Sequence, residues 1–156
     1  MDYFLLKQSG NISIPRTKDN KHDEPSIRIM QDISQLDRFD YLAAESLVSD
    51  RMKLLLEQYL LDSEWQPCAF VEPSKKLQKI FWFLPPLSYF PEQVTTAPNG
   101  TVCSIHVKKE DFCKKSPGIF RIPNPKGTPS VIVHLSVAES ILRRGLCGLE
   151  LVRLSG

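Results

Sequence analysis

The stretch at residues 130–153 constrains the fold more than any other part of this chain. Residues 131–135 form a short, β-branched apolar run, which is typical of a buried strand. Ser136, followed three residues later by Glu139, has the spacing of a capping box, so a helix is expected to begin there. Residues 149–153 then alternate apolar and polar side chains, which predicts a closing strand. The C-terminal end is therefore predicted to be a strand, helix, strand unit.

Two short helices are expected in the chain. The first is predicted from Asp50, with Ser49 as its N-cap, because apolar residues between 52 and 60 recur at helical spacing. The second, in the C-terminal unit, is expected to end at Gly145, which can adopt the left-handed C-cap conformation. In both units a short apolar run leads into the helix and a strand follows it. This echo indicates either a weak duplication or two helices that use the same capping chemistry.

The remaining apolar runs predict strands, and the strands predict the fold class. The runs lie at residues 3–6, 65–71, 77–84, 101–107 and 119–122, and Ile27, Ile29 and Ile33 also alternate with polar residues. We expect an α+β protein, a mostly antiparallel sheet with a few short helices packed on it. At 156 residues the chain is predicted to form one domain, residues 1–156.

Two long loops are predicted to interrupt this domain. Residues 15–26 are polar and charged between two prolines, so they are expected to form a solvated loop. Residues 85–100 contain four prolines, with Tyr89 and Phe90 among them, and are expected to form a long loop with aromatic content.

Composition and charge narrow the class of protein. An apolar fraction of 42% and a charged fraction of 24% are ordinary for a globular domain. The net charge of +2 is small, and Lys108, Lys109, Lys114 and Lys115 are interrupted by acidic residues, so no nucleic-acid partner is predicted. Neither a membrane helix nor a secretion signal is recognisable, and the four cysteines are irregularly spaced. We therefore expect a cytoplasmic protein with reduced thiols and no membrane partner.

The candidate catalytic and metal-ligating residues do not form a recognisable pattern. Cys103, His106 and Cys113 are ligand types for zinc, but they supply a single short spacing, and positions 103 and 106 of one strand face opposite ways. No cysteine is at a glycine-flanked strand-to-helix turn, and His134 lies in an apolar run. No catalytic residue, metal or cofactor is predicted.

Aromatic side chains are the strongest candidates for a binding surface. Tyr89 and Phe90 are residue types that anchor protein interfaces, and neighbouring prolines limit the freedom of their loop. Trp82 points away from Phe81 and Phe83 on its predicted strand, so it requires either a core or a partner. We predict that Trp82, Tyr89 and Phe90 contact a partner.

The C-terminal motif resembles a known family. Residues 131–149, preceded by Ile119-Phe120-Arg121 and a turn with proline and glycine, are similar to the closing motif of immunity family eleven of bacterial polymorphic toxin systems, to which family forty-three is related. The order of the N-terminal run at 3–6, the Val48-Ser49 entry to a Leu-rich helix and the strand after Trp65 also resembles that family.

The resemblance implies an α+β protein of a toxin-producing bacterium that binds and neutralises a cognate protein toxin and is not itself an enzyme. A homo-oligomer is compatible with this reading. Two alternatives stay open from the residues: a small hydrolase or metal-binding enzyme that uses cysteine and histidine, and a regulatory protein-interaction module.

Overall fold

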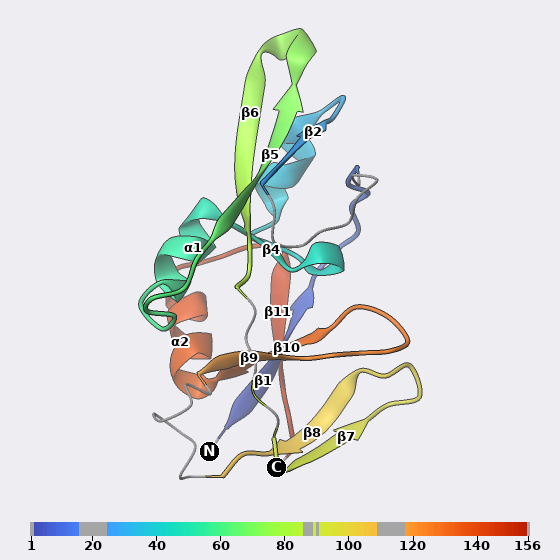
Figure 1. Ribbon diagram of the computed structural model, residues 1–156, viewed down its shortest axis with the longest axis vertical. Coiled ribbons are helices and arrows are strands. Elements are labelled where there is room, and N and C mark those ends of the chain that lie inside the picture. The colour runs from blue at the N-terminus through green and yellow to red at the C-terminus, as the bar shows by residue number, and fades with distance from the viewer. Residues whose placement is uncertain (1, 16–24, 86–88, 90, 109–117, 156) are drawn as a thin grey trace.

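The computed structural model describes residues 2–15, 25–85, 89, 91–108 and 118–155. They form one compact α+β domain in which most strand pairs are antiparallel, as the sequence predicts. Figure 1 shows two larger sheets stacked along the long axis, with helices α1 and α2 on the same side of the molecule. The predicted loop at 15–26 lies largely outside the described residues.

The C-terminal unit contributes to a four-stranded antiparallel sheet. Its strands, in spatial order, are β11 (Leu149–Arg153), β1 (Tyr3–Gln8), β10 (Ser130–His134) and β9 (Ile119–Ile122). Both faces of the two central strands are buried. Leu6, Val131 and Val133 contribute to one hydrophobic cluster, whereas Leu5 and Ile132 contribute to another. This burial on both faces explains the uninterrupted apolar run in β10.

A five-stranded sheet forms the upper part of the molecule in Figure 1. Its spatial order is β2 (Ser26–Ile29), β5 (Gln66–Glu72), β6 (Leu77–Phe83), β4 (Leu47–Ser49) and β3 (Tyr41–Leu42). Strand β2 runs parallel to β5, and the other pairs are antiparallel. The 3-10 helix η1 (Ile33–Arg38) packs on one face through Leu36, next to Phe70 and Phe81. Two shorter 3-10 helices, η2 (Ala43–Glu45) and η3 (Pro73–Lys75), lead into β4 and β6.

The prediction of one long loop at residues 85–100 is wrong for residues 93–96. Strand β7 (Gln93–Thr96) pairs with β8 (Val102–His106) in a two-stranded hairpin. Val94 and two threonines favour a strand, and Asn99-Gly100 supplies the turn, with Gly100 at a φ of +86°. Pro91 and Pro98 therefore flank the strand rather than extend the loop.

The two α-helices are placed as predicted, but one cap is different. Helix α1 (Asp50–Leu56) begins after Ser49, whose hydroxyl accepts the N–H of Met52, and it ends before the predicted residue 60. Helix α2 spans Leu135–Arg143, and its N-cap is His134, whose side chain accepts the N–H of Ser136. The predicted N-cap at Ser136 is therefore wrong by two residues: the helix already begins at Leu135, and the His134 imidazole at the end of β10 caps it.

The two strand, helix, strand units are similar in topology as well as in sequence pattern. In the upper sheet β6 lies between β4 and β5, and in the lower sheet β1 lies between β10 and β11. In each unit the inserted strand is antiparallel to both flanking strands. The helices meet where the Tyr59 hydroxyl, just after α1, lies 2.6 Å from the Ser140 hydroxyl of α2.

Candidate functional site

Strand β2 turns its charged residue inward and its two isoleucines outward. Arg28 is 4% exposed, whereas Ile27 and Ile29 are 74% and 70% exposed. Successive side chains of a strand point to opposite faces, so the opposite facing of β2 would bury both isoleucines. Leaving two isoleucines exposed costs about 3–6 kcal/mol relative to burying both. The observed facing is therefore the reverse of what the hydrophobic effect alone selects.

A buried ion pair holds Arg28 in this position. Its Nη2 donates to Glu45 Oε1 at 2.8 Å, and its Nη1 donates to the other oxygen of the same carboxylate. Nη1 also donates to the Pro15 carbonyl at 3.1 Å. The guanidinium carbon lies 6.0 and 5.9 Å from the ring centroids of Phe70 and Phe83. The charge of the Arg28 guanidinium is thus neutralised by Glu45 inside the molecule, with the rings of Phe70 and Phe83 nearby.

The outward residues of β2 continue across the sheet as an apolar surface. Ile27 is paired with Ala69 of β5, and Ala69 in turn is paired with Ile80 of β6. Pro67 is paired with Trp82 in the same way. We call this surface the bare sheet face; it consists of Ile27, Ile29, Pro67, Ala69, Val71, Gln78, Ile80 and Trp82.

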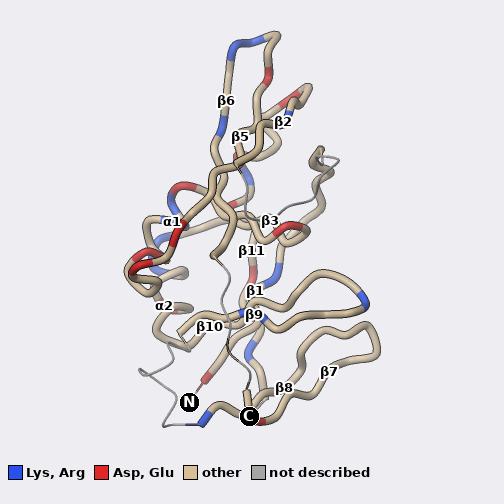
Figure 2. Tube along the Cα trace, in the orientation of Figure 1, with Lys and Arg blue, Asp and Glu red and all other residues tan. Residues whose placement is uncertain are grey.

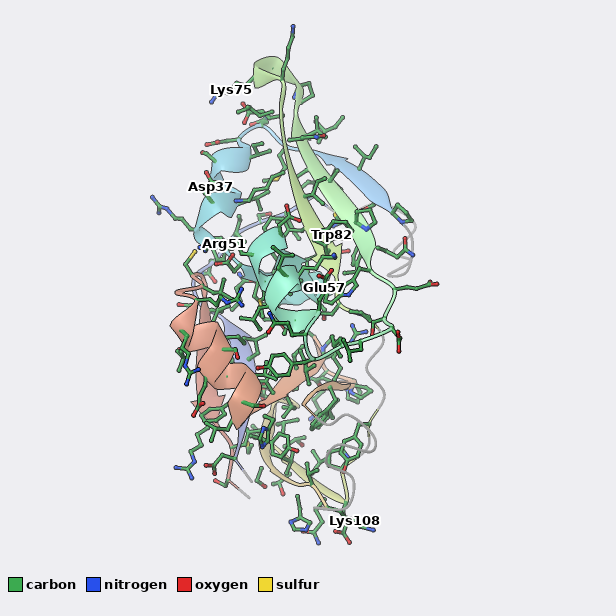
Figure 3. The ribbon with its side chains drawn as sticks, turned by 90° about the vertical axis from the view of Figure 1, so that its left-hand side faces the viewer. Asp37, Arg51, Glu57, Lys75, Trp82 and Lys108 are labelled. Atoms are coloured by element: carbon green, nitrogen blue, oxygen red, sulfur yellow. The ribbon has the colours of Figure 1, made fainter. Side chains whose placement is uncertain are left out.

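The bare sheet face is solvent-accessible and uncharged. Its β5 and β6 members are partly or fully exposed, while η1 covers the opposite face of the same strands. Figure 2 shows acidic and basic positions interspersed along the elements, with basic positions at the tip of the β5–β6 hairpin. The charged side chains of β2 and β6, Arg28 and Lys79, belong to the η1 side, where Lys79 pairs with Asp37 of η1. Figure 3 shows Asp37 on that side of the sheet.

Helix α1 forms the lower border of this face and fixes Trp82. The indole Nε1 of Trp82 donates to Asp50, the first residue of α1. Lys53 Nζ lies 4.5 Å from the Trp82 ring centroid and 5.6 Å from that of Trp65, and it also pairs with Glu57. Figure 3 shows Trp82 beside α1 and close to Glu57. The Trp82 ring is thus held in one orientation by contacts within the protein.

The other two predicted contact residues do not join Trp82 on this face. Tyr89 is 6% exposed, and its ring packs edge-on against Phe120 with centroids 5.1 Å apart. The Tyr89 ring thus fills the interior and is not presented to a partner, so we do not place it in the candidate site. Phe90 lies outside the described residues, and its contact with a partner stays a prediction. Alternation in the sequence indicates a strand at Ile27 and Ile29 but does not indicate which face of that strand meets solvent.

The zinc hypothesis gains no geometric support from the described residues. Cys103 and His106 are both exposed on β8, and His106 Nε2 lies 3.5 Å from Glu92 Oε2. Cys113 lies outside the described residues. Within the described ranges, no group of three or more histidine, cysteine, aspartate or glutamate residues could hold a metal ion.

Cys68 and Cys147 are in environments that disfavour the thiolate. Burial raises the pKa of Cys68, which accepts a hydrogen bond from Ser26. Burial also raises the pKa of Cys147, and the neighbouring carboxylate of Asp40 adds to the effect. Since the thiolate is the nucleophilic form, neither position favours covalent catalysis. His134 serves as a helix cap, and burial lowers its pKa.

An open depression of about 650 Å³ lies between η1 and the segment after β1. Its ionisable lining residues are Asp32 and Arg38, next to neutral side chains and backbone. Hydrogen bonds from the Ser34 side chain and backbone lower the pKa of Asp32, so this carboxylate is ionised at neutral pH. It is therefore poorly suited to act as a general acid.

No protein-family model and no curated protein matches this chain. Among the helices in the described ranges, none has the length and apolar character required to cross a bilayer.

Proposed function

We propose that this protein binds a cognate protein toxin and neutralises it, and that the bare sheet face is the contact surface. The observation that carries the proposal is the facing of β2, in which Arg28 is buried and Ile27 and Ile29 are exposed. A strand that keeps two isoleucines in water at a cost in stability is well explained if a partner covers them.

The chemistry of the face supports a protein as the partner. Contiguous exposed apolar surface on a folded domain marks interaction sites, and tryptophan is enriched among residues that dominate binding energy. Trp82 stands at one end of the face in a fixed orientation. Because the outward side chains are uncharged, we expect the matching surface of the partner to be apolar at its centre.

The identity of the partner as a toxin rests on the C-terminal resemblance to immunity families eleven and forty-three. An inhibitor of this kind requires a preformed surface and no catalytic residues of its own. Its place of action would be the bacterial cytoplasm, where it would meet the toxin before release. In this role the protein is a stoichiometric inhibitor and not an enzyme.

The test is co-expression of this protein with the polypeptide encoded directly upstream, followed by size-exclusion chromatography and a growth assay. We expect a stable complex, and we expect the protein to restore growth to cells that express the upstream polypeptide. A complex without growth rescue would favour the regulatory interaction module. A toxic upstream polypeptide that neither binds nor is neutralised would refute the proposal.

A further inference from the structure

We infer that the buried Arg28–Glu45 pair is a positioning device: it selects the facing of β2 that keeps Ile27 and Ile29 on the bare sheet face. The purpose of this device rests on the proposed function, since an outward isoleucine pair is useful to a binding surface. The facing itself is a property of the free protein and can be measured without a partner.

Strand β2 has little else to specify its facing. It is four residues long, and among the described strands it pairs with β5 alone. A shift of its register by one residue would turn every side chain to the other face. The shift would bury Ile27 and Ile29 and expose Met30, which is now 9% exposed. Because the shift would bury two isoleucines and expose one methionine, apolar burial alone favours the shifted strand.

Glu45 reverses this preference. Its carboxylate is 8% exposed in the 3-10 turn η2, and both of its oxygens accept hydrogen bonds from the Arg28 guanidinium. In the shifted strand Arg28 would point into solvent, and Glu45 would remain buried without a cation. An uncompensated buried charge is strongly destabilising. The Glu45 carboxylate therefore makes the facing in which Arg28 is buried the more stable one.

The pair is also poorly optimised for stability alone. The Nε of Arg28 is buried and lacks a hydrogen-bond partner within the described part of the chain. Buried polar pairs are best attested as devices that fix register, and apolar replacements of such pairs are often as stable or more stable. The Arg28–Glu45 pair leaves the Nε donor unsatisfied among the described residues but favours one of the two facings of β2. Both properties fit a role in fixing the strand register.

The test is the accessibility of a thiol placed at position 27. The parent for this experiment carries Ile27→Cys in a background where Cys103, Cys113 and Cys147 are replaced by serine. Its maleimide labelling rate is compared with the rates of two variants, Glu45→Met and the double variant Arg28→Ser/Glu45→Met, in which position 28 stays polar. Gln78→Cys, at an exposed position on β6, replaces Ile27→Cys in a matched set and reports any general loosening.

We expect the labelling rate of the thiol at position 27 to fall at least tenfold in both variants, while the thiol at position 78 reacts at an unchanged rate. Circular dichroism and thermal unfolding verify that each variant is folded. If Glu45→Met does not fold, the labelling rate of the double variant tests the inference. A folded variant in which the thiol at position 27 reacts at the parental rate would overturn the inference. Because no partner takes part, failure to find a toxin would refute the proposed function and leave this result standing.

Discussion

At the scale of single residues, Asp40 joins three segments that are distant in the sequence. Its carboxylate accepts hydrogen bonds from the Ser49 hydroxyl at 2.5 Å, from Arg51 Nη2 at 2.7 Å and from the backbone N–H of Cys147 at 2.7 Å. These contacts connect the N-terminus of α1 to the turn after α2. The carboxylate therefore couples the two helical units of the fold.

The Asp40→Asn variant should lose stability in a pH-dependent way. Burial opposes ionisation of Asp40, but the hydrogen bonds from Ser49, Cys147 and Arg51 hold its pKa below the ordinary value of 3.8. A carboxyl with a lower pKa when folded stabilises the protein above the unfolded pKa and loses that contribution as the pH falls through the folded value. We expect a loss of about 1–3 kcal/mol at pH 7 in urea unfolding. The deficit should shrink at pH 3, and an equal deficit at both pH values would contradict this account.

Two glycines near the C-terminus should respond differently to a methyl group. Gly145 and Gly148 have φ values of +62° and +71°. A Cβ at Gly148 would lie 2.4 Å from the Arg38 carbonyl oxygen, whereas a Cβ at Gly145 would meet nothing within 4 Å. Gly145→Ala should therefore cost only the strain of a left-handed alanine, about 1 kcal/mol.

Gly148→Ala adds a collision with backbone to the same strain, so we expect at least roughly twice that loss. Thermal unfolding of the two variants side by side measures the difference. Equal melting temperatures would mean that the backbone at Arg38 gives way freely.

At the scale of elements, the N-cap of α2 is a titratable side chain, His134, so its contribution to stability should depend on pH. His134 Nδ1 accepts the Ser136 N–H at 3.2 Å, which requires an unprotonated nitrogen. Burial is the main reason that the pKa of His134 lies below its ordinary value of 6.5, and the positive N-terminus adds to this. Stability from this cap is therefore complete above the unfolded pKa and declines as the pH falls through the folded pKa.

His134→Asn should retain a cap and remove this titration, because asparagine is a strong N-cap residue. We expect the melting temperature of the wild-type protein to fall between pH 7 and pH 5, and that of the variant to fall less. Leu142→Ala, at an exposed position of the same helix, serves as the comparison and should preserve the wild-type slope. A variant with the full wild-type slope would show that the decline arises elsewhere.

Sequence patterns located most elements but not the way each one faces. The apolar runs of β1, β9 and β10 and the alternation in β11 predicted strands that the structure confirms. Strand β7 was missed because its four exposed residues lack an apolar alternation, and pairing with β8 maintains it. The facing of β2 was also unpredictable, because it depends on Glu45, which reaches Arg28 only in the folded chain.

At the scale of the whole molecule, three hydrophobic clusters fill the spaces between the sheets, the helices and the hairpin. Within the described part of the chain, η1 packs on one face of the upper sheet, and the outward residues of β2, β5 and β6 on the other face are partly or fully exposed. The sequence predicted one α+β domain and placed Trp82 in a contact surface. It could not predict the bare sheet face, because β2 joins the β5–β6 hairpin through a pairing that is distant in the sequence.

The double variant Ile27→Asp/Ile29→Asp tests whether the bare sheet face is functional. Both side chains are mostly in water, so the free protein should unfold within about 1 kcal/mol of wild type. Leu142→Asp is the matched control, because Leu142 is also 70% exposed but lies on α2, outside the bare sheet face. Circular dichroism and urea unfolding establish that both variants are folded before any binding experiment.

Titration calorimetry of the purified upstream polypeptide with these three proteins tests the central claim most directly. We expect the double variant to bind at least ~100-fold more weakly than wild type, because two charges would be placed against an apolar partner surface. Leu142→Asp should bind like wild type. Binding of the double variant at wild-type affinity would contradict the claim that the bare sheet face is the contact surface.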